Sequence, residues 1–354
     1  MLPLLLVNEF WGSLLWYVLT LLVSVHAMWL CTQMARKFWP VAPSQQFWLC
    51  SLACLLVLSH FWNGLRWQNI SLVVTYLLIA SLWLYLHDRP YWAGLCLAGG
   101  VVLKLFPALL VLYFVGKGRF RVVASAATWL VVMLVVIPSV VFGWKGNQAY
   151  LRQWWTEVCL SASVPDAVAG RAVYKQAYSV ARTNNQSVQA VLYRLLSNKS
   201  HIDNSSTDRW ARLVGRAVAA VLLLVSAHAL WLGRSETNRP RVVLEFCFVS
   251  LVMLLVSPVT LFHYFTLLAL PVTVATMSLA GTMPSRQTRG YLIGLAAYGT
   301  ANLAASVSTF CFTHGVLLIG VLALWVSFFW ALAGRHDRQQ GSVGTKELLR
   351  LRWA

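Results

Sequence analysis

Charged residues are scarce in this chain of 354 residues. Asp, Glu, Lys and Arg together make up 11% of it, whereas 59% is hydrophobic. A soluble domain of this length cannot carry such a composition, because most of its surface would have to be apolar. The scarcity of charge excludes a soluble protein. It predicts a multi-pass membrane protein with room for about ten helical segments of about 20 residues each.

Patterns typical of metal sites, disulfide frameworks and secretion signals are missing as well. Of seven cysteines only Cys159 lies in a long polar stretch, and the spacing fits neither a metal site nor paired disulfides. Met1 to Phe10 lacks the basic region and the small-residue cleavage site of a signal peptide. No internal repeat is visible. We therefore expect no metal, no other cofactor and no cleavable leader.

Positive charge exceeds negative charge, with 28 Lys and Arg against 10 Asp and Glu. The basic residues are scattered over short connectors instead of gathering on one face, so nucleic acid is not an expected partner. They are typical of topology determinants and lipid-headgroup contacts, and the positive-inside rule places their connectors in the cytoplasm. These connectors lie around Arg36/Lys37, Asp88/Arg89, Lys117/Arg119/Arg121, Arg234/Arg239/Arg241, Arg286/Arg289 and Arg335/Arg338.

The apolar runs between these connectors predict an all-α, polytopic membrane helical bundle. The expected segments are 11–31, 47–62, 70–86, 92–115, 121–142, 213–233, 243–257, 262–281, 290–308 and 314–333. They form one integral-membrane domain, 1–335, followed by a cytoplasmic tail, 336–354. The polar connector 143–211 is far longer than a link requires, and we expect it to be an external, functional cap with short helices.

Lys104 stands in the middle of segment 92–115, with Pro107 three residues later. A lysine at that depth costs about 2.5–3.5 kcal/mol and is usually kept to bind something in a polar cavity. Both flanks of the segment are basic, so both ends are predicted to be cytoplasmic. A re-entrant hairpin with its apex at 104–107 and arms of about 12 residues satisfies this. A kinked helix with a snorkelling lysine is the alternative.

With the hairpin accepted, three polar strings, 63–69, 182–187 and 257–264, face outward near its apex. Asn, Gln and Ser side chains suit the hydroxyls of a sugar, whereas Lys104, Arg194 and His263 suit the oxygens of a phosphate. We therefore expect a site for a sugar attached to a lipid phosphate.

Structural interpretations of the same residues remain open. Asn185 could only start the helix that follows it, and His263 could cap a helix or sit in the interface belt. Arg66 and Arg182 could be solvated loop charges.

Four strings occur in the order and spacing of one family. They are Asn63–Asn69, Ala93-Gly94-Leu95 with Lys104-Leu105-Phe106-Pro107, Asn185-Gln186-Ser187 with Arg194, and Ser257-Pro258 with His263-Tyr264. From Met1 to about residue 333 the chain resembles the family 87 integral-membrane glycosyltransferases of the GT-C superfamily.

The resemblance implies inverting, metal-independent transfer of a hexose, with mannose as the leading precedent. The donor would be a polyprenyl-phosphate sugar, the acceptor a glycan or glycolipid, and the active side the external face of the cytoplasmic membrane. Lys104 and His263 would hold the donor phosphate, and we add Arg194. Gln68, Asn69, Asn185 and Gln186 would line the sugar site, to which we add Ser187 and Tyr264.

The family's general base has no counterpart that we can assign. In the family it is a carboxylate on the first external loop, and Met1-Leu2-Pro3 aligns just after that loop. Glu9 is not expected to replace it, and spacing favours none of Glu157, Asp166, Asp203 or Asp208. We therefore expect either an incomplete start or a member without catalysis. A binder or translocator of lipid-linked sugar, or an inactive subunit of a cell-envelope assembly, is the alternative function.

Overall fold

The computed structural model describes residues 8–156, 183–197, 206–236, 238–280 and 285–333. These ranges are helical and contain no strand. The helices are α2 (Glu9–Phe38), α3 (Pro43–Arg66), α4 (Ser71–Leu86), α5 (Pro90–Leu103), α6 (Ala108–Gly116), α7 (Phe120–Val131), the π-helical turn η1 (Val132–Val136), α8 (Ile137–Phe142), α9 (Trp144–Trp154), α12 (Val188–Ser197), α13 (Ser206–Leu232), α14 (Arg239–Val256), the 3₁₀ turn η3 (Phe262–Leu268), α15 (Ala269–Ala280), α16 (Ser285–Val307), α17 (Thr309–Thr313) and α18 (Val316–Ala333).

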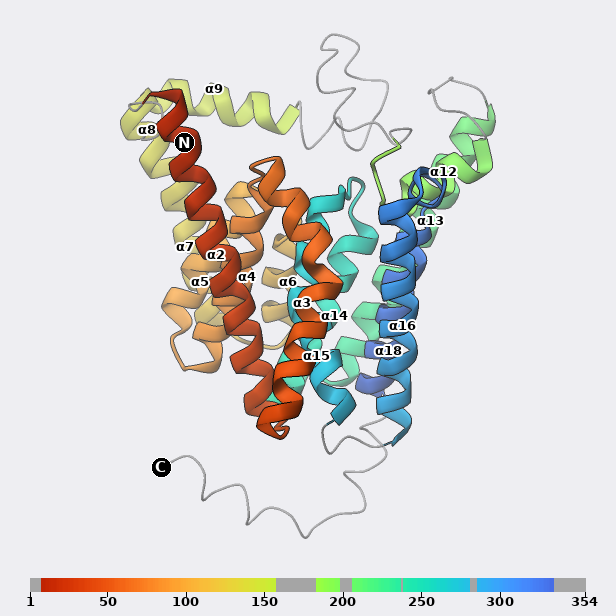
Figure 1. Cartoon of the computed structure of the whole chain (residues 1–354). Coiled ribbons are helices and arrows are strands. Elements are labelled where there is room, and N and C mark those ends of the chain that lie inside the picture. Colours follow the sequence, from red (N-terminus) through yellow and green to blue (C-terminus); the bar gives the residue numbers. More distant parts are fainter. Residues whose placement is uncertain (1–7, 157–182, 198–205, 237, 281–284, 334–354) are drawn as a thin grey trace.

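Each predicted apolar segment is helical, and most of these helices run roughly side by side in a bundle (Figure 1). Within the described ranges, six helical stretches are long and apolar enough to cross a membrane: Glu9–Phe38, Pro43–Arg66, Phe120–Phe142, Leu213–Leu232, Phe262–Ala280 and Val316–Ala333. The chain is therefore an all-α membrane protein, as its composition predicts.

Segment 92–115 forms the predicted hairpin. α5 starts beside the start of α7, because the Ser125 hydroxyl donates a hydrogen bond of 2.7 Å to the Tyr91 carbonyl. The far end of α6 returns to the same level, where Phe114 packs its ring 5.2 Å from Tyr85 at the end of α4. The helix is broken at residues 104–107, as expected from Pro107. The arms are unequal, with 14 residues in α5 and 9 in α6.

The bundle has two distinct ends. One, here called the site end, carries the loop 67–70, the hairpin apex 104–107 and the loop 257–261. The other, here called the basic end, carries the connectors 87–89 and 117–119 together with the turn between α13 and α14. Basic connectors and polar strings thus separate to opposite ends, as the positive-inside rule predicts.

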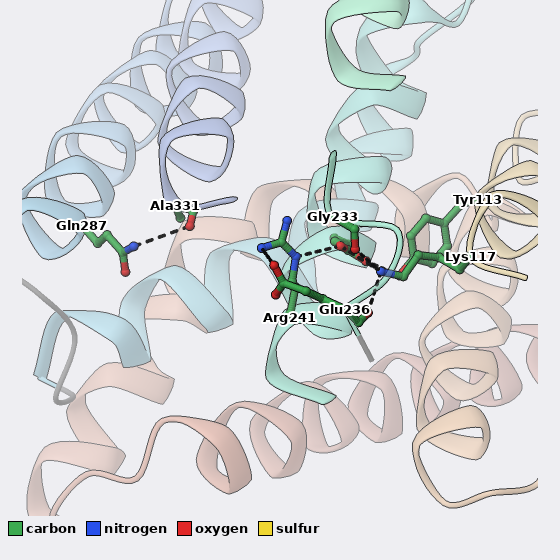
Figure 2. Close-up of polar contacts among 8 residues, drawn as sticks. Tyr113, Lys117, Gly233, Glu236, Arg241, Gln287 and Ala331 are labelled. Carbon is green, nitrogen blue, oxygen red and sulfur yellow. Dashed lines mark hydrogen bonds and ion pairs between the residues drawn. The ribbon is translucent and has the colours of Figure 1, made fainter. Parts of the chain in front are cut away.

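A buried ion network at the basic end holds the foot of the hairpin. The Lys117 ammonium lies 3.0 Å from Glu245 of α14, and both side chains are at most 3% exposed. Tyr113 of α6 donates a hydrogen bond of 2.8 Å to the same carboxylate. Figure 2 shows Lys117 also reaching the Gly233 carbonyl, while Arg241 bonds Glu236. Each charged side chain of the network has an opposite partner, which offsets part of the cost of burying it.

The expected cap is described only in part. α9 follows α8 at the site end, and α12 packs against α13 at the same end (Figure 1). Residues 157–182 and 198–205 of the cap, with Arg182, Glu157, Asp166 and Asp203, lie outside the described residues. So does the expected cytoplasmic tail, 336–354.

Candidate functional site

Lys104 is the residue at which the hairpin turns. α5 ends at Leu103, and Lys104 itself has an extended backbone with φ −151° and ψ 139°. α5 rises about 21 Å from the basic end at about 1.5 Å per residue, whereas the 23 residues from Phe120 to Phe142 rise about 34 Å. The shorter α5 places the hairpin apex below the level that the longer span reaches, and the Lys104 side chain is only partly buried.

Two side chains contact the Lys104 ammonium group. It donates a hydrogen bond to the Ser71 hydroxyl at the first residue of α4, and it lies 3.5 Å from the centroid of the Tyr264 ring. A hydrogen bond to a charged group contributes about 1.5–3 kcal/mol, and a desolvated cation–π contact about 2 kcal/mol. Together these contacts can offset the insertion cost of the lysine. Within the described residues no carboxylate pairs with it.

His263 lies beside this pair. It is the second residue of η3, only 9% exposed, and its ring centroid is 5.1 Å from that of Tyr264. Phe106 of the hairpin apex also packs against Tyr264, with 5.5 Å between ring centroids. The structure thus brings together Lys104, His263 and Tyr264 from two distant parts of the chain.

Asn69 and Gln68 form the loop that supports Ser71. The Asn69 Oδ1 atom accepts hydrogen bonds from the Ser71 amide at 2.9 Å and the Ser71 hydroxyl at 2.7 Å. A continuous hydrogen-bond chain therefore runs from Lys104 through Ser71 to Asn69. The main chain of Gln68 is held from the other side, because its carbonyl accepts a 2.9 Å bond from the Trp16 indole.

Gln68 has an unusual backbone. Its φ is +47°, in the left-handed region that normally favours glycine. The amides of Gln68 and Asn69 close the end of α3 onto the carbonyls of Leu65 and Gly64, which is the Schellman pattern. The same pattern ends α6 with a glycine, Gly118. Glycine would adopt this backbone conformation at a lower energetic cost. The presence of an exposed glutamine here therefore indicates that its side chain has a function.

Asn185 holds the cap to the loop before His263. Its Oδ1 atom accepts from the Thr260 amide at 2.9 Å, and its Nδ2 atom donates to the Pro258 carbonyl at 3.1 Å. Asn185 does not cap α12. That role belongs to Ser187, whose hydroxyl accepts from the Ala190 amide and donates to Pro258. Asn185 is thus a clip between the cap and the loop 257–261.

Gln186 and Arg194 extend this clip to α17. Gln186 donates to the Phe312 carbonyl at 3.0 Å, and Arg194 donates to the carbonyls of Thr313 and Asn185. Burial lowers the pKa of Arg194 to about 10, so it remains a cation at neutral pH. The Gln186 Oε1 atom is buried and accepts no hydrogen bond among the described residues. An unsatisfied buried acceptor costs about 1–3 kcal/mol, so a donor belongs beside it.

Residues 1–258 match the sequence pattern of glycosyltransferase family 87. This is well over half of the chain. The chain belongs to glycosyltransferase family 87. The matched range contains Lys104, the loop 67–70 and the clip residues 185–187 with Arg194, whereas His263 and Tyr264 lie just beyond it. No curated protein and no solved structure matches the chain.

Three acidic residues that the structure describes in this family 87 glycosyltransferase lie far from Lys104. Asp88, Glu236 and Glu245 lie at the basic end, each within an ion pair. Glu9 is exposed in the first turn of α2, the helix whose Trp16 reaches the loop 67–70 at the site end. No cluster of three or more His, Cys, Asp or Glu able to hold a metal occurs within the described ranges.

Two residues that hold the candidate site of this family 87 enzyme in place were not among the sequence predictions. Ser71 directly holds Lys104, and its place two residues after Asn69 in a polar-to-apolar boundary was an available signal. The Thr260 amide donates a hydrogen bond to the Asn185 Oδ1 atom. In the sequence, the nearby Pro258 indicated only that this segment is a loop. The sugar- and phosphate-binding roles of the other residues remain predictions.

Proposed function

We propose that this glycosyltransferase transfers a hexose, with mannose the leading candidate, from a polyprenyl-phosphate sugar to a glycan or glycolipid. The observation that carries the proposal is the partly buried Lys104 ammonium, held by Ser71 and Tyr264 in an apolar bundle without a carboxylate partner among the described residues. Such a group is suited to the phosphate oxygens of a lipid that reaches it through the bilayer.

The chemistry follows from where charge develops. The acceptor hydroxyl attacks the anomeric carbon, the bond from that carbon to the phosphate oxygen breaks, and the phosphate leaves with the electron pair. Lys104 would stabilise the charge that grows on the phosphate, with His263 donating a further hydrogen bond. The acceptor proton passes to a base to which we assign no residue.

The sugar would lie between the loop 67–70 and the clip. Gln68 is exposed at the site end, and the buried Gln186 Oε1 atom could accept a bond from a sugar hydroxyl. Asn185, Ser187 and Arg194 already bind main-chain carbonyls, so their contacts favour positioning the loop before His263. The side of action would be the external face of the cytoplasmic membrane, because the basic connectors lie at the opposite end.

The decisive experiment is a transfer assay in membranes, with a radiolabelled polyprenyl-phosphate hexose. We expect Lys104→Ala to abolish turnover, whereas Arg66→Ala, which removes an exposed cation near the same end, leaves it within about twofold. Equal turnover of Lys104→Ala and the unmodified protein would remove the basis of the proposal. Donor binding without any turnover in the unmodified protein would favour the binder or translocator function.

A further inference from the structure

The helix α9 leaves the bundle in an unusual direction. Gly143, with φ +73°, turns the chain after α8, and α9 then lies across the direction of the spans at the site end (Figure 1). Among the described elements it packs mainly against α8. The preceding stretch Phe120–Phe142 is the least buried of the candidate spans, so most of its surface faces lipid in a membrane. α9 is thus attached at the outer rim of the bundle.

One side chain fixes which face of α9 points toward the bilayer. Asn147 is only 3% exposed, and its Nδ2 atom donates to the Leu134 and Val135 carbonyls and to the Ser139 hydroxyl. Pro138 has no N–H to give to Leu134, four residues earlier, so this carbonyl needs an outside donor. These acceptors lie within the span, below its end at Phe142. The face of α9 that carries Asn147 therefore points back along the span, toward residues 134–139.

Large apolar side chains share that face. At about 100° per residue, Asn147 falls inside an arc of roughly 140° that also contains five such residues. They are Trp144, Tyr150, Leu151, Trp154 and Trp155. Four of these remain largely exposed: Trp144 59%, Tyr150 59%, Trp154 43% and Trp155 56%. No element among the described residues covers these four side chains, although their face points along a lipid-facing span.

The opposite arc of α9 is polar. It carries Lys145, Gln148, Arg152 and Gln153, all exposed. Tryptophan and tyrosine at the boundary, with cations above them, are the arrangement that the headgroup region of a bilayer favours.

We propose that α9 is an interfacial helix whose Trp144–Tyr150–Trp154–Trp155 face is inserted in the lipid surface. Lys145 and Arg152 contact the lipid phosphates above it. Asn147 sets its rotation by binding the Leu134 carbonyl, which Pro138 leaves without a donor, together with the Val135 carbonyl and the Ser139 hydroxyl. The occupant of the exposed face is the bilayer itself, not a protein partner. This proposal does not depend on which sugar or lipid donor the enzyme uses.

The test places spin labels on the two faces of α9 in the full-length protein. In a background with the native cysteines replaced, Tyr150→Cys and Trp154→Cys report the apolar face, and Gln148→Cys reports the polar face. The labelled proteins are reconstituted in vesicles of phosphatidylcholine and phosphatidylglycerol. Collision with oxygen, which concentrates in lipid, is compared with collision with a water-soluble nickel chelate.

We expect positions 150 and 154 to favour oxygen and position 148 to favour the nickel chelate. Preference for the chelate at all three positions would place α9 in water and overturn the proposal. Shielding of 150 and 154 from both reagents would show a protein covering the face and would overturn it as well. Since an aromatic substitution could disturb folding, each variant must keep the melting temperature of its cysteine-free parent, and agreement of 150 with 154 is required.

Discussion

The Lys104 ammonium lies over the face of the Tyr264 ring, 3.5 Å from its centroid. This contact joins the apex of a helical hairpin to a 3₁₀ turn that follows it by 160 positions in the sequence. It holds a cation in the apolar interior, where no carboxylate among the described residues neutralises it. An arriving phosphate would therefore find a cation that is already placed and still able to donate hydrogen bonds.

Replacing the Tyr264 ring should weaken the interaction that holds the Lys104 ammonium in place. Tyr264→Phe keeps the aromatic face, whereas Tyr264→Leu removes a contact of about 1–2 kcal/mol, or about 5–30-fold in an equilibrium constant. We expect donor affinity to be highest in the unmodified protein, slightly lower in Tyr264→Phe and clearly lowest in Tyr264→Leu. Titration of each variant with the lipid donor measures this. A phenylalanine variant as weak as the leucine variant would assign the effect to the hydroxyl.

We expect the native Gln68 to lower the stability of the protein while increasing its activity. Glycine adopts the left-handed backbone without the steric cost that other residues pay, about 1 kcal/mol. Gln68→Gly should therefore have an equal or higher melting temperature but slower sugar transfer. Asp88→Gly is the matched control, because Asp88 has φ +57° at the basic end. Normal transfer by Gln68→Gly would exclude a role for the side chain.

The buried carboxylate of Glu245 should be important for stability. Glu245→Gln leaves Lys117 and Arg241 without their shared partner, and breaking such a buried pair costs about 3–5 kcal/mol. The exposed pair Arg239–Asp88 provides a control, since Asp88→Asn should cost at most about 1 kcal/mol. Thermal unfolding in detergent compares the two. A similar loss in both variants would contradict the importance given to burial.

Asn185 should protect the loop before His263. Its Oδ1 atom accepts from the Thr260 amide, so Asn185→Ala should accelerate hydrogen exchange of the segment 257–264 by about tenfold or more. Asn184→Ala is the neighbouring control, because the Asn184 Oδ1 atom has no hydrogen-bond partner among the described residues. Mass spectrometry of the exchanged peptides measures both. Unchanged exchange in Asn185→Ala would mean that the clip does not stabilise the loop.

The orientation of the bundle can be tested at two positions with little structural cost. Gly116 has open space around its Cβ position at the basic end, and Gln148 is exposed on α9 at the site end. In a cysteine-free background, Gly116→Cys should react with an impermeant thiol reagent only after permeabilisation. Gln148→Cys should react in intact cells. The reverse pattern would place the site end in the cytoplasm.

The sequence predicted the hairpin because charge and apolar length act over a whole segment. Basic flanks on both sides of 92–115 required both ends at one surface, and Pro107 located the break. The unequal arms could not be foreseen, since they depend on where Lys117 meets Glu245. Glu245 itself was a missed signal, as an acid inside an apolar run needs a partner, and Arg241 stands four residues before it.

The residue types gathered around Lys104 were predictable from the sequence, but their geometry was not, and their roles in binding stay predictions. A cation in an apolar segment and a polar Ser-Pro…His-Tyr string indicated Lys104, His263 and Tyr264. The contacts of Asn185 and Ser187 go to main-chain carbonyls of a loop about 70 residues away, and no pattern in the sequence specifies such partners. For this reason the sequence could not separate residues that would bind sugar from those that hold the loop.

The central claim is that the Lys104 ammonium binds the phosphate of a lipid. The most direct measurement compares binding of a polyprenyl monophosphate and the matching uncharged polyprenol to the purified protein in nanodiscs, for the unmodified chain and for Lys104→Met, which keeps the length of the side chain. We predict that the unmodified protein prefers the phosphate over the alcohol and that Lys104→Met loses this preference. Equal preference for the phosphate in both proteins would contradict the account.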